Sequence, residues 1–266
     1  MHLRPLLFAL MGMAPLACSG KVVAPGGDNP SGLAENASDL GDVVSQSASL
    51  TALLALAGSG AADPSSAATA AASIQGFFVP SGCLSTQTEA ATGTSTHTFQ
   101  DCAGPWGLSH VSGVVTIGFT AMPAGAVTLQ VSTQGLSVHR ARFDYAGTAT
   151  VTTSGVGRAL DYVGRLSGTT ARGRSFSHDG SWVSSWRIGG SCISLDGQSA
   201  GAIDGVLVQT TVSGYERCRD ECPGAGILTV DEVGSGNKVT IAFDGTSEAI
   251  ATDASGSASI TLACGL

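Results

Sequence analysis

The sequence predicts a mainly β protein in which antiparallel strands follow one another as a meander, with an N-terminal αα-hairpin packed on the sheet. Charged residues make up only 12% of the chain, and glycine accounts for 37 of its 266 residues. This composition favours strands joined by turns over helical bundles. From residue 77 onward apolar and polar residues alternate with a period of two, which is typical of sheets with one buried face. Asp-Gly pairs, which suit tight hairpins, recur between the alternating segments.

Residues 77–266 form the predicted β domain. The alternation is clearest at residues 127–132, 238–243 and 259–262, and Asp-Gly pairs stand at residues 179–180, 196–197, 204–205 and 244–245. About a dozen strands fit at this spacing, and so many strands in one sheet curl or split. We therefore expect a strongly curved sheet, a partial barrel or a sandwich.

An internal similarity is compatible with two related halves of the β domain, at residues 83–190 and 191–266. Cys-Ala-Gly at residues 102–104 is followed by Val-Thr-Ile-Gly-Phe at 115–119, and Cys-Pro-Gly at 222–224 is followed by Val-Thr-Ile-Ala-Phe at 239–243. Chance similarity between glycine- and threonine-rich strands is the alternative.

The predicted helical hairpin occupies residues 39–76. Its first helix runs over residues 39–57 and ends at the Gly-Ser-Gly of residues 58–60. The apolar residues of this helix fall largely on one face: Leu40, Val43, Val44, Leu50, Leu53, Leu54 and Ala57. The second helix starts at Asp63, with Pro64 in the first helical position, and runs to Gln75. We expect both apolar faces to pack on the sheet that follows.

The first 17 residues are predicted to be a lipoprotein signal peptide. Arg4 precedes an apolar run at residues 6–14, which is too short to span a bilayer. Ala17 and Cys18 then resemble the lipobox of bacterial lipoproteins, in which the cysteine is acylated and becomes the mature N-terminus. Pro15 stands where that motif usually has leucine, so an ordinary signal peptide that leaves Cys18 unmodified is the alternative. Residues 18–38 are rich in Gly, Pro, Ser and Asn and predict a flexible tether.

Seven cysteines occur in the chain, and six remain when Cys18 is set aside. An even number of cysteines behind an export signal indicates disulfides. Six cysteines allow 15 connectivities, and the sequence alone does not choose among them. We prefer the pairs Cys83–Cys102, Cys192–Cys218 and Cys222–Cys264, each of which would close a local hairpin or meander. The alternative is a zinc site that uses Cys218 and Cys222, which an oxidising compartment disfavours. The sequence predicts no metal and no cofactor.

Charge is distributed unevenly, with acidic segments on both sides of an arginine-rich middle and a net charge of −8. Nucleic-acid binding is excluded, because it depends on a strongly basic stripe that this acidic chain lacks. Arg172 and Arg174 are candidates for a local anion site. Trp182 and Trp186, four residues apart on one strand face, are candidates for a sugar or lipid site. Solvated charges and aromatic packing within the sheet are the alternatives.

No catalytic constellation stands out, and the sequence therefore predicts a protein that is not an enzyme. Residues 197–201 match the motif G-x-S-x-G, but a nucleophile elbow needs a strand before the serine and a helix after it, whereas this segment lies in β sequence. The histidines His97, His110, His139 and His178 lack the spacing of a histidine metal motif.

The whole layout resembles a family of exported bacterial lipoproteins of uncharacterised function. The resemblance rests on the lipobox, the alanine-rich helices and short motifs at residues 77–80, 82–83, 102–108 and 213–215. We expect an envelope-anchored protein with a structural or partner-binding role, held in the membrane by its N-terminal lipid and contacting an envelope protein or a lipid. Ser19, in place of an inner-membrane retention Asp, favours the outer membrane or the cell surface. The alternatives are a carrier of a lipid or hydrophobic ligand, with helices covering a concave sheet, and a secreted hydrolase.

Overall fold

The computed structural model describes residues 30–58, 61, 63–121, 126–218 and 222–265. Within these residues, thirteen strands form one open sheet in which each strand pairs antiparallel with the next along the chain. The predicted mainly β class and the meander are therefore confirmed. The predicted signal peptide at residues 1–17, Cys18 and the tether up to residue 29 lie outside the described residues.

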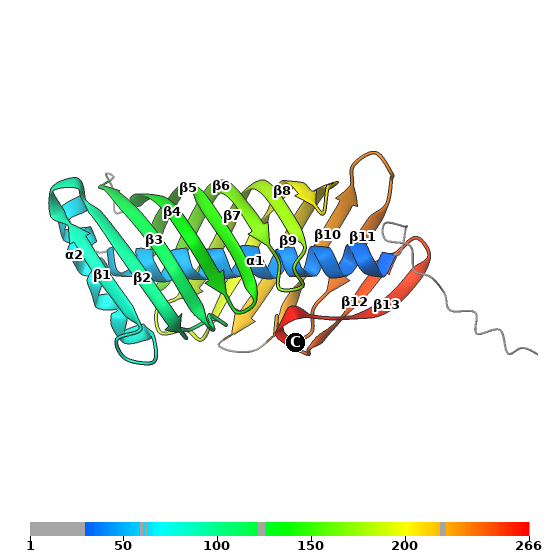
Figure 1. Ribbon diagram of the computed structural model, residues 1–266, viewed down its shortest axis with the longest axis horizontal. Helices are drawn as coiled ribbons and strands as arrows, with labels where there is room; N and C mark the ends of the chain where they lie inside the picture. The colour runs from blue at the N-terminus through cyan, green and yellow to red at the C-terminus, as the bar shows by residue number, and fades with distance from the viewer. Residues whose placement is uncertain (1–29, 59–60, 62, 122–125, 219–221, 266) are drawn as a thin grey trace, which may run out of the picture.

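Helix α1 runs along the long axis of the molecule, and the strands cross that axis (Figure 1). The helices are α1 (Pro30–Gly58) and α2 (Pro64–Ala71), and the 3-10 helices are η1 (Ala72–Phe77), η2 (Ala90–Thr92) and η4 (Ala263–Gly265). The strands, in chain order and in sheet order, are β1 (Leu84–Glu89), β2 (Thr94–Cys102), β3 (Val111–Ala121), β4 (Val127–Val138), β5 (Ala141–Ser154), β6 (Gly157–Thr169), β7 (Ser175–Arg187), β8 (Cys192–Ile203), β9 (Val206–Cys218), β10 (Ala225–Glu232), β11 (Lys238–Ala242), β12 (Glu248–Asp253) and β13 (Gly256–Thr261).

Helix α1 begins at Pro30, earlier than the predicted start at residue 39, so the predicted tether is wrong for residues 30–38. Proline fits the first turn of a helix, because the N–H that it lacks would have no partner there. The first turns are packed by the small residues Ala34 and Ala37, both of which are fully buried. The predicted apolar face was defined by large apolar residues, so the alanines did not extend the predicted helix to residue 30.

The second helix of the predicted hairpin is present but short. Asp63 caps α2 by accepting a hydrogen bond from the Ser66 backbone N–H at 2.9 Å, and Pro64 occupies the first turn as predicted. The α-helix ends at Ala71 and continues as the 3-10 helix η1, whereas the sequence predicted an α-helix up to residue 75. Helix α2 contacts α1 and strands β1 to β3.

Helix α1 is buried on all sides, although the sequence predicted a single apolar face. Every residue from 48 to 55 is buried, and eight consecutive positions cover the whole circumference of an α-helix, because each adds about 100°. The helix contacts every strand from β4 to β13. Ser49 and Thr51 share this environment with the apolar residues around them. The sheet therefore wraps around α1.

The sheet encloses α1 because strand ends on opposite sides of the sheet come into contact. In an antiparallel meander, successive connections alternate between the two edges at which the strands end. Trp106 in the β2–β3 connection lies against Trp186 at the opposite end of β7, with ring centroids 5.9 Å apart. Arg172 in the β6–β7 connection donates a hydrogen bond to the Thr261 carbonyl at the opposite end of β13. We call the line along which these two contacts join opposite strand ends the seam.

The thirteen described strands form one open sheet rather than the two layers of a sandwich, with β1 and β13 at the two ends of the strand order. Strands β7 and β8 pair over residues 176–186 and 193–203, so the sheet continues across residue 190. The relationship between the two halves stays a prediction.

Candidate functional site

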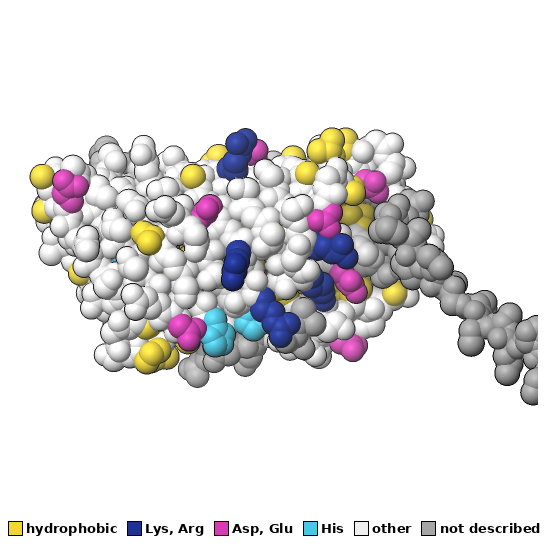
Figure 2. Space-filling model, in the orientation of Figure 1, with side chains coloured by type: hydrophobic (Ala, Val, Ile, Leu, Met, Phe, Trp, Pro, Cys, Tyr) yellow, Lys and Arg dark blue, Asp and Glu magenta, His cyan; other side chains and the backbone are white. Residues whose placement is uncertain are grey.

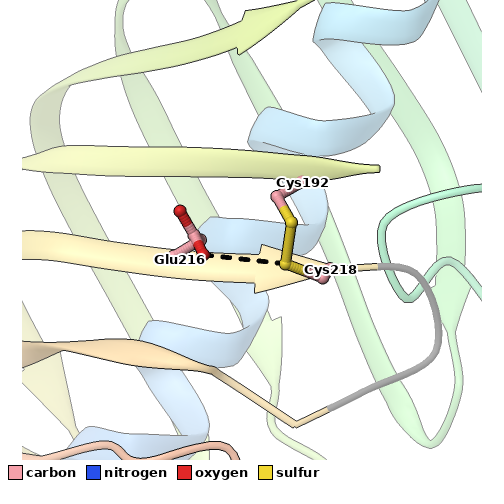
Figure 3. Close-up of side chains that lie close together, drawn as sticks. All are labelled: Cys192, Glu216 and Cys218. Atoms are coloured by element: carbon pink, nitrogen blue, oxygen red, sulfur yellow. Dashed lines mark hydrogen bonds between the residues drawn. A yellow bond between two sulfur atoms is a disulfide. The ribbon is translucent and has the colours of Figure 1, made fainter. Parts of the chain in front are cut away.

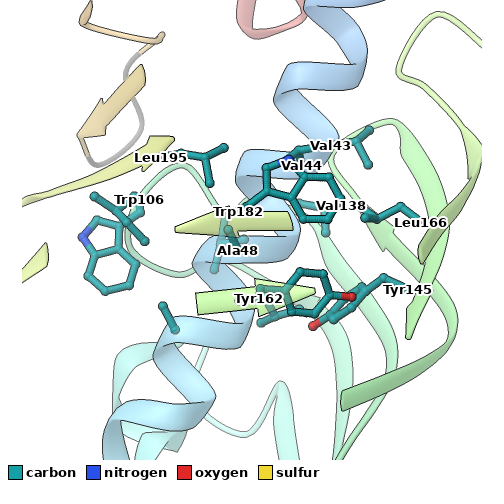
Figure 4. Close-up of a cluster of buried hydrophobic side chains, with 14 of the residues drawn as sticks. Val43, Val44, Ala48, Trp106, Val138, Tyr145, Tyr162, Leu166, Trp182 and Leu195 are labelled. Atoms are coloured by element: carbon teal, nitrogen blue, oxygen red, sulfur yellow. The ribbon is translucent and has the colours of Figure 1, made fainter. Parts of the chain in front are cut away.

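The concave face of the sheet forms a groove that α1 occupies. Gly147, Gly164 and Gly180 are direct neighbours across β5, β6 and β7 on this face. A Cβ atom would lie 2.8 Å from the Tyr162 hydroxyl at Gly147 and 2.5 Å from it at Gly164, and Gly180 leaves equally little room beside the Trp182 ring. The glycines therefore let both rings lie against the sheet backbone, and Figure 4 shows these rings beside helix α1.

Trp182 and Trp186, the predicted candidates for a sugar or lipid site, face this groove. Trp182 stacks on Tyr162 with ring centroids 5.6 Å apart, and Trp186 packs against Trp106 at the seam. Their exposed fractions are 3% and 5%, so a ligand would reach either ring only if α1 or the seam moved. Their surroundings match the packing alternative.

The middle of α1 is tied to the sheet through hydroxyl groups. The hydroxyls of Thr51 and Tyr145 lie 3.0 Å apart and share a hydrogen bond. Burial raises the pKa of Tyr145, and its phenol therefore stays protonated. The contact satisfies two polar groups deep in an apolar region, where an unpaired hydroxyl is costly.

Asp39 of α1 forms a buried ion pair at the seam. Its carboxylate contacts Arg172 and accepts a hydrogen bond from the Thr170 hydroxyl at 3.1 Å. Loss of water around the carboxylate outweighs the attraction of Arg172 and raises the pKa of Asp39 to about 6. The same guanidinium reaches the carbonyl of Thr261. One arginine therefore joins α1, the β6–β7 connection and β13.

Asp42, one helical turn further along α1, forms a second ion pair. It contacts Arg217 near the end of β9 and accepts a hydrogen bond from the Gln46 amide at 2.7 Å. Arg217 also packs on Gly107 in the β2–β3 connection, which leaves no room for a Cβ atom there. This second arginine joins α1 and β9 to the connection on the other side of the seam.

Arg172 and Arg174, the predicted candidates for an anion site, both have carboxylate partners. Arg172 pairs with Asp39, and Arg174 pairs with Asp204 at 3.1 Å. Asp204 also accepts a hydrogen bond from the backbone N–H of Ser175 at 2.8 Å. The two arginines hold the β6–β7 connection in place and do not converge on a shared anion site.

The six cysteines outside the signal region form the three predicted disulfides, Cys83–Cys102, Cys192–Cys218 and Cys222–Cys264. Cys218 and Cys222, the alternative zinc ligands, are therefore bonded to different partners. In the described residues, one cluster of three possible metal ligands is formed by Cys192, Glu216 and Cys218. Figure 3 shows this cluster, in which Glu216 lies 3.7 Å from the Cys218 sulfur. Because both sulfurs of this group belong to the disulfide, neither is a thiolate that could bind zinc.

The serine of the G-x-S-x-G match does contact a histidine. The Ser199 hydroxyl lies 3.3 Å from Nδ1 of His178 on the neighbouring strand, but both residues are buried in the middle of β8 and β7. The segment is a strand throughout, without the strand-to-helix turn that exposes a nucleophile. Burial lowers the pKa of His178 to about 4, so the imidazole is neutral. His97 is buried in the same way, between Thr86 and Ser95.

Two hollows in the described residues differ in size and in access to solvent. A hollow of about 10 Å³ beside Asp42 and Tyr215 holds one water molecule at most. A hollow of about 460 Å³ lies open to solvent at the ends of β4, β5 and β6, where Arg142 and Asp144 line it. Pockets for small molecules bury most of the ligand, and neither hollow does so for a lipid. The face in Figure 2 is largely uncharged, with a few scattered acidic and basic side chains.

The carboxylates that hold α1 were not predicted as site residues. Asp39 and Asp42 stand three residues apart on a helix that has no Lys or Arg between residues 30 and 58. Two buried-face carboxylates without local partners require cations from elsewhere in the chain. The sequence therefore indicates that Asp39 and Asp42 need cationic partners, but it does not identify the arginines that pair with them.

No protein-family model, curated protein or solved structure matches the chain. None of the helices in the described residues is long and apolar enough to cross a membrane.

Proposed function

We propose that the protein is a non-enzymatic lipoprotein of the bacterial cell envelope with a structural or partner-binding role. The occupation of the groove by α1 carries this proposal. A carrier keeps space for its ligand, roughly 300–1,000 Å³ for a small molecule. Here α1 covers the apolar surface of the groove, and the hollow beside it measures about 10 Å³. The interior thus serves stability, and the outer surface is available for contacts.

The proposed acylation of Cys18 supports a structural role. Cys18 precedes Pro30 by 12 residues, and a chain of this length reaches at most about 40 Å. A lipid on Cys18 would therefore be connected through a short segment to α1, the most enclosed element of the fold. A force on the anchor would act on a helix held by two buried ion pairs and not on an edge strand.

The outer face of the sheet supports contacts based on hydrogen bonds. Thr211, Thr229, Thr240 and Thr252 are direct neighbours across β9, β10, β11 and β12. None of them is buried, so their hydroxyls form a row on the outer surface. Such a row offers donors and acceptors without net charge, which suits a neutral polar partner at the outer membrane or the cell surface.

Carriage of a lipid or hydrophobic ligand is the second candidate, because the groove would expose Tyr162, Trp182 and other aromatic rings if α1 moved out. A secreted hydrolase has less support. Ser199 and His178 are 7% and 0% exposed, and a nucleophile must reach its substrate.

Acylation is tested in the native host by labelling with a fatty acid. The wild-type chain should incorporate the label and fractionate with membranes, and Cys18→Ala should lose the label and appear in the soluble fraction. Cys222→Ala is unsuitable as a control because it breaks a disulfide, so Ser19→Ala serves as the neighbouring control. Labelling of the Cys18→Ala chain would show that the lipobox assignment is wrong.

The filled interior is tested by native mass spectrometry of the full chain purified from its own envelope. We expect the mass of the acylated chain alone. Hydrogen exchange of α1 adds a second measurement, because amides of an element that opens only with the whole fold exchange at the slowest rate. A stoichiometric bound lipid, or exchange in α1 well ahead of β5 to β8, would favour the carrier over our proposal.

A further inference from the structure

Unusual backbone conformations gather at one edge of the sheet. Five non-glycine residues in the described chain have positive φ, and four of them are Asp101, Trp106, His110 and His139, with φ between 52° and 58°. They belong to the end of β2, the β2–β3 connection and the β4–β5 turn. Aspartate and histidine tolerate this conformation better than most residues. Such residues nevertheless concentrate at functional sites.

The β4–β5 turn brings two histidines together that are 29 residues apart in sequence. The ring centroids of His110 and His139 lie 6.3 Å apart. The backbone N–H of His139 donates to the Ser109 carbonyl at 2.7 Å, which fixes the turn against the β2–β3 connection. The proximity of the two rings therefore follows from the backbone as well as from the side chains.

Each histidine has one ring nitrogen held by a neighbour. Nδ1 of His110 lies 2.7 Å from an oxygen of Asp101, and Nδ1 of His139 lies 3.3 Å from the Ser109 hydroxyl. When Nδ1 carries the proton that is donated to such a partner, Nε2 carries a free lone pair. This arrangement is typical of histidines that bind metal ions, whose second ring nitrogen donates to a carboxylate or another acceptor.

Both Nε2 atoms lack a protein partner among the described residues. Nε2 of His139 is also buried from solvent, and a buried ring nitrogen without a hydrogen bond is uncommon in folded proteins. His110 is 69% exposed at its side chain, so its ring can turn. The pair thus combines the buried, unpartnered Nε2 of His139 with the Nε2 of His110, whose exposed ring can change its orientation.

We propose that His110 and His139 bind one divalent transition-metal ion through their Nε2 atoms, with Asp101 and Ser109 orienting the rings. Imidazole nitrogen suits Zn²⁺, Ni²⁺ and Cu²⁺, and Cu²⁺ forms the most stable complexes of the three. With metal–nitrogen bonds of about 2.1 Å, two imidazoles on one ion have centroids no more than about 6.5 Å apart. The observed centroid separation of 6.3 Å lies within this limit, and the exposed ring of His110 can turn toward the ion. Water completes the coordination on the solvent side.

The remaining described histidines provide an internal contrast. His97 and His178 have exposed fractions of 0%, and Nδ1 of each already faces a hydroxyl. Nε2 of His178 also lacks a partner, but it is closed off from solvent together with the rest of the ring. Within the described chain, an ion from solvent therefore meets an accessible imidazole only at His110, whose ring adjoins that of His139 with its buried Nε2.

The test uses the full chain in detergent without a histidine tag. Isothermal titration with Zn²⁺ should give one ion per chain, and the variants His110→Gln and His139→Gln should each lose this stoichiometric binding. Asp101→Asn should weaken affinity about tenfold, as expected for loss of an orienting partner. Asp204→Asn is the matched control, because Asp204 is the fifth residue with positive φ and pairs with Arg174 instead.

Electron paramagnetic resonance of the wild-type chain with one equivalent of Cu²⁺ gives a readout that does not depend on the folding of a variant. Coupling to two imidazole nitrogens is the expected result. The proposal would be overturned by absence of stoichiometric binding or by coupling to fewer than two imidazoles. Unchanged binding in a folded double variant, His110→Gln with His139→Gln, would also overturn it.

Discussion

Replacement of Arg217 by methionine should strongly destabilise the closure of the sheet around α1. Arg217 and Asp42 have side-chain exposed fractions of only 6% and 13%. Methionine keeps most of the length of the side chain and removes its charge, so the carboxylate of Asp42 is left buried without a cation. Removal of one partner from a buried ion pair costs about 3–5 kcal/mol. We expect the free energy of unfolding to fall by an amount in that range.

A second substitution distinguishes the cost of the unpaired Asp42 carboxylate from the cost of lost packing. In the double variant Arg217→Met with Asp42→Asn no charge is left unpaired, and we expect at least half of the lost stability to return. Arg165→Met is the matched control. It makes the same substitution in the Arg165–Asp179 pair, whose side chains are 66% and 64% exposed, and it should change stability little because solvent screens the pair.

The assay is unfolding in urea at pH 7 without reductant, which keeps the disulfides intact. Tryptophan fluorescence reports the transition, because Trp106, Trp182 and Trp186 are all buried in the fold. A change of midpoint without a change of slope indicates altered stability. The reasoning fails if Arg217→Met is no more destabilising than Arg165→Met, or if Asp42→Asn restores nothing.

Three further predictions concern stability. Because the folded-state pKa of Asp39 is raised from 3.8 to about 6, its contribution to stability is fully present only below the unfolded pKa and is lost as the pH rises to about 6. From pH 4 to pH 7 the wild type should therefore lose about 2.4 kcal/mol relative to Asp39→Asn. Parallel urea titrations at both pH values measure this difference, and a constant difference would contradict it. Gly41→Ala should stabilise α1 by about 1 kcal/mol, since the new Cβ would lie 3.4 Å from Leu228 in ordinary contact; calorimetry should show a higher Tm, and a lower Tm would reveal overpacking. Replacing Cys222 and Cys264 together by serine opens a loop with a sequence separation of 42 residues and should cost about 4 kcal/mol in the urea assay, whereas an unchanged midpoint would mean that the loop is held by other contacts.

Much of the fold followed from local rules. Alternation with a period of two marked strands such as β4 and β11, because successive side chains of a strand point to opposite faces. The cap of α2 by Asp63 followed from the preference of helix starts for a short side-chain acceptor before proline. The three disulfides were predicted by assuming that each closes a local hairpin or meander. Because every strand pairs with its neighbour in the chain, that assumption agreed with the topology.

The environment of α1 could not be predicted in the same way. A helix with Leu40, Val43 and Leu54 on one stripe is predicted to lie on a surface, and its serines and threonines to face water. Those residues are buried because the sheet coils far enough for opposite ends of its strands to meet at the seam. Twist and coiling develop over many strands of a sheet, so the residues of the helix alone do not predict them.

The sequence by itself determined the β class and the meander, because both depend on residues close together in the chain. It favoured the observed pairing of the cysteines without deciding it. Of the predicted Asp-Gly turns, those at residues 179–180 and 196–197 are wrong, because they lie within β7 and β8. The sequence also predicts export and acylation at Cys18, which the described residues do not include. Only the tertiary structure decided what the groove contains, which arginines neutralise Asp39 and Asp42, and that His110 meets His139. These contacts join segments that the chain separates by tens of residues, and only the curvature of the whole sheet brings them within reach of one another.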